Sequence, residues 1–280
     1  MMPIKKVLIF GGTHGNEWTG VYVIKKYAEK LHSQFPDLDL HFIHANPEAF
    51  TINKRFKDED LNRAFQYIHE ERPDSYEHQL AVKYKKMIDE EPCFVVDLHT
   101  TTAHMGNTII ISHPQPLNFQ VASLLVEKLK DTRVILSPDP NKKYLASQSE
   151  FGMMIEVGPV ANGIIKADAL EGTLQLIKEI LMGLSRHQHL TSGELEIFEE
   201  IEDVFYPLDD SENINAYIHP DLQDADFIKI SGEYKAFRTF TGEDIKLKTN
   251  EELYPIFINE AAYYPTKLAF TLCRKRVLNF

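Results

Sequence analysis

Strand and helix patterns alternate through the first two thirds of the chain, and this alternation constrains the fold more than any other feature. The apolar run KVLIF predicts a buried strand, and apolar residues at helical spacing (Ile24, Tyr27, Ala28 and Leu31) predict a helix directly after it. Further strands are expected at LHFIH, CFVVDLH, NTIIIS, RVILS and GMMIEVG, with helical spacing between them around 80–88, 121–129 and 170–184. This rhythm predicts the α/β class, with a mainly parallel mixed sheet flanked by helices on both faces.

The pattern changes near residue 190. From GELEIF onward, short β-type runs such as YKAFRTF, YPIFI and KLAFTLC follow one another, separated by Gly, Asn, Asp and Pro. Short apolar runs with turn residues between them are typical of a β-rich unit. We therefore expect two domains, an α/β domain over residues 1–191 and a smaller β-rich domain over residues 192–280.

Charge and cysteine content narrow the function classes. The 280 residues carry a formal net charge of −12, whereas nucleic-acid binding needs a basic face, so no nucleic-acid partner is expected. No apolar run approaches the roughly 18 to 20 residues that span a bilayer, and VLIF is too short for a secretory signal, so no membrane partner is expected. Cys93 and Cys273 lack metal-type spacing, which favours a reduced, cytoplasmic setting.

The loop GGTHGNEWTG, residues 11–20, stands where the first strand gives way to the first helix. It matches neither the phosphate-binding pattern G-x-x-x-x-G-K-[ST] nor the dinucleotide pattern G-x-G-x-x-G. His14 and Glu17 remain, and Gly15 allows a sharp turn that directs both side chains to the carboxyl edge of the sheet, where open α/β sheets place their sites. Taken alone the pair is a weak signal, because most such pairs are solvated loop residues.

A second polar cluster ends the strand CFVVDLH. His99 would lie at the same sheet edge as the first loop, and with His14 and Glu17 it completes a His₂Glu set, which is typical of catalytic zinc with an open fourth position. The alternative for His99 is a core histidine bonded to a backbone carbonyl. Asp97 is either a surface residue or the carboxylate that holds a ligand histidine by its other ring nitrogen, and which histidine it serves stays open.

Two further stretches carry groups suited to catalysis. In NKRFKDEDLNRAF, the guanidinium groups of Arg55 and Arg63 and the amide of Asn62 suit a carboxylate or a polarised carbonyl, although a solvated loop is the alternative. In MMIEVGP, Glu156 stands among apolar residues, where a carboxylate is costly to bury without a partner or a task. Such a glutamate can exchange protons with a metal-activated water, unless it lies on the exposed side of an edge strand.

Five motifs occur in order along the chain: FGGTHGNEWTGV, DEDLNRAF, DLHTTT, IEVGP and NEAAYY. Together with YIHPDLQDADF in the C-terminal part, they closely resemble the aspartoacylase/succinylglutamate desuccinylase family of zinc amidohydrolases. The resemblance implies a zinc carboxypeptidase-like fold and hydrolysis of the amide bond of an N-acyl-L-amino acid, most readily N-acetyl-L-aspartate, to the amino acid and acetate. It also makes a homodimer a plausible assembly.

The resemblance implies a role for each motif residue. One zinc ion per chain is expected on His14, Glu17 and His99. Glu156 resembles the general base and acid, and Arg55 the group that polarises the scissile carbonyl. The residues that resemble substrate-binding groups are Asn62, Arg63, Tyr144, Gln148 and Tyr263.

Two positions depart from the pattern of the vertebrate aspartate-specific enzyme. Gln148 stands where that enzyme has an arginine for the side-chain carboxylate, and Thr266 stands where it has a lysine. A charge-assisted contact contributes about 1.5–3 kcal/mol, so a neutral or aromatic N-acetylated amino acid, or succinylglutamate, is the alternative substrate. Lys142 or Lys143 is a candidate to compensate. A peptide-trimming carboxypeptidase and a non-enzymatic binding module are the competing function classes.

Overall fold

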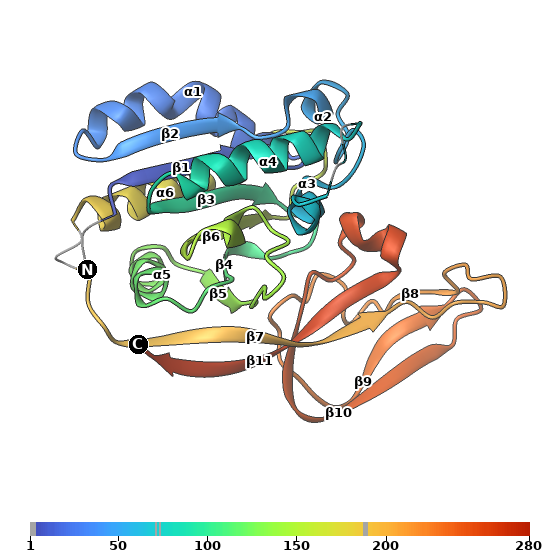
Figure 1. Cartoon of the computed structure of the whole chain (residues 1–280). Helices are drawn as coiled ribbons and strands as arrows, with labels where there is room; N and C mark the ends of the chain where they lie inside the picture. The colour runs from blue at the N-terminus through green and yellow to red at the C-terminus, as the bar shows by residue number, and fades with distance from the viewer. Residues whose placement is uncertain (1–3, 71, 73, 187–189) are drawn as a thin grey trace.

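The computed structural model describes residues 4–70, 72, 74–186 and 190–280 (Figure 1). Its strands are β1 Lys6–Gly11, β2 Asp39–His44, β3 Cys93–Thr100, β4 Gly106–Ile111, β5 Thr132–Leu136, β6 Phe151–Gly158, β7 Glu194–Phe205, β8 Ala216–Ile218, β9 Ile230–Thr239, β10 Asp244–Ile256 and β11 Leu268–Asn279. Its helices are α1 Trp18–Gln34, α2 Pro47–Thr51, α3 Leu61–Ala64, α4 Tyr76–Asp89, α5 Pro116–Lys128 and α6 Ala167–Ser185, with short 3₁₀ turns η1 Phe65–Tyr67, η2 Ala146–Gln148 and η4 Ala261–Thr266. None of the helices in these ranges combines the length and the apolar character that crossing a membrane requires.

The strands of the described residues form one sheet in the order β2-β1-β3-β6-β4-β5-β7-β11-β10-β9-β8. The pairs from β2 to β6 are parallel, β4 runs antiparallel to β6, and β5 returns to a parallel pairing with β4. The sheet is therefore mainly parallel and mixed in its first half, which confirms the expected α/β class.

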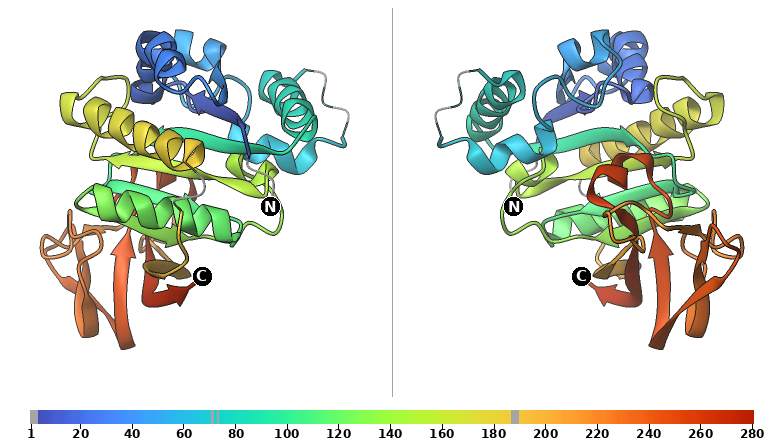
Figure 2. Two further views of the ribbon diagram at one scale, coloured as in Figure 1. Left: turned by 90° about the vertical axis from the view of Figure 1, so that its left-hand side faces the viewer. Right: turned by 90° about the vertical axis from the view of Figure 1, so that its right-hand side faces the viewer.

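Helices cover both faces of this half of the sheet (Figure 2). Along β1 the side chains alternate between the faces: Val7 and Ile9 pack in one apolar cluster, and Leu8 and Phe10 in another. The first cluster includes apolar residues of α1, α5 and α6, and the second includes apolar residues of α3 and α4. Burial on both faces explains why these strands read as unbroken apolar runs.

The C-terminal part is β-rich, as expected. β7 pairs with β5 on one side and with β11 on the other, and the long β7–β11 pair extends the sheet toward β10, β9 and β8 (Figure 1). A third apolar cluster, with Phe237 and Phe270 among its buried residues, lies in this part. The division into domains 1–191 and 192–280 stays a prediction, and the sheet itself continues across it.

Candidate metal centre and active site

The loop after β1 turns sharply because it passes close to the backbone of α2. A Cβ on Gly15 would lie 2.1 Å from the carbonyl carbon of Ala49, so only glycine fits there. The Gly15 amide donates to the carbonyl oxygen of Arg55 at 3.0 Å, which ties this loop to the segment that carries Arg55. His14 lies in this loop and Glu17 directly precedes α1, so both side chains are held at the carboxyl end of β1.

The three side chains of the expected metal site lie together and are buried. Nδ1 of His14 lies 2.6 Å from Oε1 of Glu17, and Nδ1 of His99 lies 2.9 Å from Oε2 of the same carboxylate. The ligand atoms of all three residues are within 4.8 Å of one another, and the two imidazole rings are 4.8 Å apart at their centres. Segments that are 82 residues apart therefore meet at one point.

Each histidine contacts a second carboxylate through Nε2, the ring nitrogen that faces away from Glu17. Nε2 of His99 lies 2.8 Å from Oδ2 of Asp97, and Nε2 of His14 lies 3.3 Å from Oδ1 of Asp60. A carboxylate on Nε2 favours the tautomer that carries its proton there and leaves the Nδ1 lone pair free for a metal. The structure thus assigns Asp97 to His99, and it adds Asp60, whose role the sequence did not reveal.

The charges of this cluster suit a bound cation. Burial raises the pKa of Glu17, but the charges and hydrogen bonds of His14 and His99 outweigh it and hold that pKa well below its ordinary value. Glu17 is therefore an anionic carboxylate, facing two imidazole nitrogens in a buried place. A buried charge needs a partner, and this donor set of two imidazoles and one carboxylate fits zinc.

Glu156 lies beside this cluster on β6. The parallel register pairs His99 on β3 with Glu156 on β6, and β6 lies between β3 and β4, so the edge-strand alternative for Glu156 is wrong. Burial raises the pKa of Glu156 to about 8, with a smaller opposing effect from His99. Its Oε2 is buried without a hydrogen-bond partner in the described part of the chain, which is unusual for a carboxylate oxygen unless a ligand or water satisfies it.

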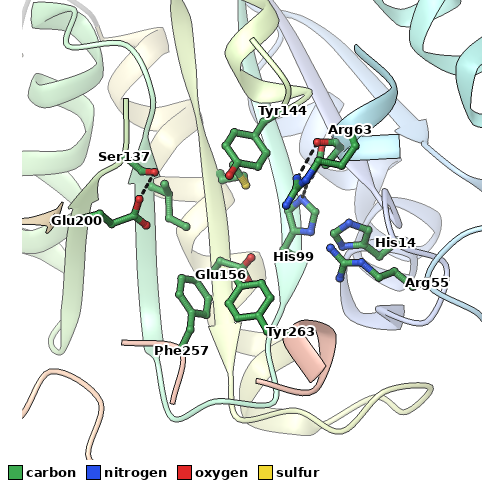
Figure 3. Close-up of a pocket in the computed structure, with 13 residues that line it drawn as sticks. His14, Arg55, Arg63, His99, Ser137, Tyr144, Glu156, Glu200, Phe257 and Tyr263 are labelled. Carbon is green, nitrogen blue, oxygen red and sulfur yellow. Dashed lines mark hydrogen bonds between the residues drawn. The ribbon is translucent and has the colours of Figure 1, made fainter. Parts of the chain in front are cut away.

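A pocket opens over these residues and holds about 500 Å³ of space free of protein atoms, part of it open to solvent. Figure 3 shows His14, His99 and Arg55 at one end of it, with Glu156, Tyr263 and Phe257 facing the middle. Its lining residues come from the strands β3, β4, β6 and β7, from α3 and η4, and from connecting loops: His14, Arg55, Asn62, Arg63, His99, Ile110, Ser137, Tyr144, Met154, Glu156, Glu200, Phe257 and Tyr263.

The expected polar groups Arg55, Asn62, Arg63 and Tyr144 all line this pocket. Arg55 donates from Nε to Oδ2 of Asp60 at 2.9 Å. Asn62 accepts a hydrogen bond from the Leu145 amide at 2.9 Å, and its Nδ2 lies 3.4 Å from Nε2 of His99. Arg63 donates to the Asn62 carbonyl at 2.8 Å and has its guanidinium carbon 5.2 Å from the centre of the Tyr144 ring. All four are pocket residues, and the solvated-loop alternative given for Arg55, Asn62 and Arg63 is wrong.

Gln148, in contrast, is not among the described residues that line the pocket. Its amide donates to the backbone carbonyls of Lys142, at 2.5 Å, and Tyr144, at 2.9 Å. The Gln148 side chain therefore stabilises the turn that carries Tyr144. Thr266 is exposed and donates to the Tyr263 carbonyl at 2.9 Å. Neither Lys142 nor Lys143 is among the pocket-lining residues of the described chain.

The C-terminal part contributes Phe257 and Tyr263 to the pocket, with their rings in an edge contact at 5.7 Å. Burial raises the pKa of Tyr263 well above its ordinary value, so its phenol keeps the proton and can donate a hydrogen bond. Glu260 caps η4, the turn that carries Tyr263, and accepts from the Thr102 amide at 2.7 Å. Glu260 was not predicted from the sequence, although an acidic residue directly before AAYY is a signal for a helix cap.

Ser137 and Glu200 were also missed. Ser137 follows β5 directly, and a serine just past the end of a strand that lies in the same sheet as the site was a usable signal. Glu200 belongs to a run of acidic residues, EEIED, in which nothing distinguishes it from its solvated neighbours. Only the pairing of β7 with β5 brings it to the pocket.

Comparisons with known proteins place nearly the whole chain in the family that its sequence motifs resemble. Residues 3–184 match the family model of the succinylglutamate desuccinylase/aspartoacylase catalytic domain, and residues 193–275 match that of the AstE/AspA barrel-sandwich hybrid domain. A probable aspartoacylase of Trichodesmium erythraeum is 36% identical over 98% of both chains. An N-acyl-aromatic-L-amino acid amidohydrolase (carboxylate-forming) of Xenopus laevis is 31% identical over 98% of this chain and 95% of its own. The crystal structure of murine aminoacylase 3 superposes with a TM-score of 0.94 at 28% identity, covering 100% of this chain and 98% of that one. The chain belongs to the succinylglutamate desuccinylase/aspartoacylase family.

Proposed function

We propose that this protein is a zinc-dependent hydrolase of the amide bond of N-acyl-L-amino acids. The observation that carries the proposal is the buried His14, Glu17 and His99 cluster, whose ligand atoms lie within 4.8 Å of one another. The unpartnered Glu156 oxygen beside it supports an enzyme over a binding module that merely retains the fold. The relatives named aspartoacylase and N-acyl-aromatic-L-amino acid amidohydrolase act in the same reaction class.

The chemistry divides between the metal and the chain. Zinc held by His14, Glu17 and His99 would supply Lewis-acid polarisation of the acyl carbonyl and lower the pKa of a nearby water. Glu156 accepts a proton from the attacking water and later delivers it to the nitrogen of the departing amine. A carboxyl group with a pKa of about 8 suits both transfers near neutral pH.

Arg55 is the proposed electrophilic partner at the acyl carbonyl. Its guanidinium is held by Asp60 at 2.9 Å and lies 3.7 Å from Glu17, so it stands next to the proposed metal position with other N–H groups unused by these contacts. Donors held in advance of the reaction stabilise the negative charge that develops on the carbonyl oxygen. The carbon–nitrogen bond then breaks, which yields a carboxylate and a free amino acid.

The α-carboxylate of the substrate is assigned to Arg63 and Tyr144. Arg63 offers a planar guanidinium that can grip a carboxylate with two parallel hydrogen bonds, and Tyr144, against which it stacks, adds a hydroxyl donor. Asn62 supports both groups, because its backbone carbonyl accepts from Arg63 and its side-chain oxygen accepts from the amide of Leu145, the residue after Tyr144. Tyr263 closes the pocket from the C-terminal part, which we propose as a separate domain from residue 192 that shapes the entrance.

N-acetyl-L-aspartate is the first substrate that the family resemblance suggests. The second candidate, an aminoacylase for neutral or aromatic N-acetylated amino acids, is favoured by a specific observation. Gln148 neither carries a charge nor lines the pocket, so no cation takes the place of the arginine expected there among the described residues. Among the described residues that line the pocket, the arginines are Arg55 and Arg63. Arg55 is assigned to the acyl carbonyl and Arg63 to the α-carboxylate, so neither is left for a side-chain carboxylate.

The test combines metal analysis with a substrate panel. The purified protein should contain one zinc ion per chain and release acetate from N-acetyl-L-amino acids, but no amino acid from a short unblocked peptide. Glu156→Gln should retain the zinc and lose at least about 100-fold in kcat, the range of general acid–base catalysis. Glu171→Gln, an exposed glutamate on α6, is the matched control and should keep both. A protein without bound metal, or a Glu156→Gln variant with wild-type turnover, would contradict the proposal.

A further inference from the structure

The pocket has two chemically different ends. His14, His99 and Arg55 stand at one end, and Ser137 and Glu200 stand at the other (Figure 3). The first end holds the groups of the proposed reaction. No step of that reaction uses the second end, although it places a carboxylate inside a site for a small molecule.

One carboxylate oxygen of Glu200 is available to bind a ligand. Its Oε2 accepts a hydrogen bond from Oγ of Ser137 at 2.5 Å, which orients the carboxylate and leaves its other oxygen available. No lysine, arginine or histidine of the described residues lies within ion-pair distance, 4.0 Å, of it; Lys143 attracts it only from farther away. Half-buried carboxylates without a paired cation are costly to keep, and a positively charged or hydrogen-bond-donating ligand would compensate this one.

The space between the two ends is apolar. Met154 lies two residues before Glu156 on β6, so both side chains face the pocket, and the register places Ile110 of β4 next to Met154. Phe257 adds a third apolar wall. A ligand that reaches from the reaction end to Glu200 must therefore pass an apolar stretch before it meets the carboxylate.

The sheet sets the length of this stretch. The pocket crosses the neighbouring strands β6, β4, β5 and β7, and three spacings of about 4.8 Å put the strands that carry Glu156 and Glu200 about 14 Å apart across the sheet. The two side chains shorten the gap, but an aspartate side chain spans only a small part of it. Its carboxylate would also point toward Glu200, and two carboxylates in one partly buried site repel each other.

We propose that Ser137 and Glu200 form the side-chain subsite of this pocket and select N-acyl-L-amino acids whose side chain is an apolar stem that ends in a cation. The inference rests on the proposed amidohydrolase function and specifies its substrate class. The ammonium group of such a side chain pairs with the Glu200 carboxylate, and its methylene stem lies against Ile110, Met154 and Phe257. The α-carboxylate and the acyl group stay at the other end.

The experiment compares three acetylated amino acids on the zinc-loaded protein. Nα-acetyl-L-lysine carries the cation, N-acetyl-L-norleucine has the same stem without it, and N-acetyl-L-aspartate carries the opposite charge. We expect kcat/KM for the lysine compound to exceed that for each of the others at least tenfold. Because the ratio compares substrates within one protein, it does not depend on the fraction of enzyme that is folded.

The variant Glu200→Gln should lower the lysine-to-norleucine ratio at least tenfold, and Glu202→Gln, an exposed glutamate on the same strand, should leave it unchanged. The inference is overturned if wild-type protein hydrolyses the norleucine or aspartate compound as well as the lysine compound. It is also overturned if Glu200→Gln leaves the ratio as it was. Hydrolysis of none of the three by zinc-loaded protein also overturns the inference, and the wider panel of N-acyl amino acids described above then shows separately whether the proposed function holds.

Discussion

Glu260 joins the C-terminal part of the chain to the loop that follows β3, and its removal gives a sharp test of how the pocket is held. Its Oε2 accepts hydrogen bonds from the amides of Thr102 and Ala103, at 2.7 and 3.2 Å, and from the hydroxyl groups of Thr101 and Thr102. Its Oε1 caps η4 through the Ala262 amide at 3.0 Å. One carboxylate thus serves five donors, and the turn that it caps carries Tyr263 into the pocket.

The cost of Glu260→Ala follows from these contacts. Loss of the helix cap costs about 1 kcal/mol, and a hydrogen bond to a charged acceptor contributes about 1.5–3 kcal/mol. The bonds share one acceptor and water reaches the half-buried Thr102, so their contributions do not add. We expect the free energy of unfolding to fall by about 3–4 kcal/mol, in the range for breaking a buried charged network. Because η4 is released, kcat/KM should fall at least tenfold as well.

Urea unfolding of the zinc-loaded protein measures the first effect and steady-state kinetics the second. Glu252→Ala is the matched control: this glutamate pairs with Lys229 at 2.9 Å on the exposed surface, and such pairs contribute at most about 1 kcal/mol. If Glu260→Ala costs no more than Glu252→Ala and keeps its kcat/KM, Glu260 does not hold the pocket together and the structural reasoning fails.

Three further predictions concern the metal site, the pH dependence of stability and the first loop. Asp97→Asn should weaken zinc binding about 10- to 100-fold, measured by competition with a chelator, because the amide orients the His99 ring less well than the carboxylate; unchanged affinity would remove Asp97 from the site. Burial raises the pKa of Asp226 to about 6 against the opposing backbone hydrogen bonds, so the folded state holds this proton more tightly than the unfolded state. Its stabilising effect is therefore complete below about pH 4 and is lost as the pH rises through 6, a change of about 3 kcal/mol. Urea unfolding from pH 4 to 7 should show this loss in wild type relative to Asp226→Asn, and parallel profiles would contradict it. Gly15→Ala should destabilise the protein by about 2 kcal/mol or more, since its Cβ would overlap the backbone at Ala49; a thermal midpoint equal to that of wild type would show that the loop moves aside freely.

The sequence alone determined the α/β rhythm and the β-rich C-terminal part, because apolar periodicity is local and each strand of a doubly covered sheet is an unbroken apolar run. It also made His14, Glu17, His99 and Glu156 candidates, since parallel strands bring their carboxyl ends to one edge and the motifs lie at those ends. The choice between these roles and their alternatives rested on the resemblance of the five ordered motifs to a known family.

The tertiary structure decided what depends on contacts between distant segments. It paired Asp97 with His99 and Asp60 with His14, turned Gln148 to the backbone of its own turn, and brought Glu200 to the pocket through the pairing of β7 with β5. Residue type and spacing do not reveal which way a side chain points or which distant carboxylate contacts the Nε2 of a histidine. That depends on the packing of loops and strands far apart in the chain, and so does the chemistry of the far end of the pocket.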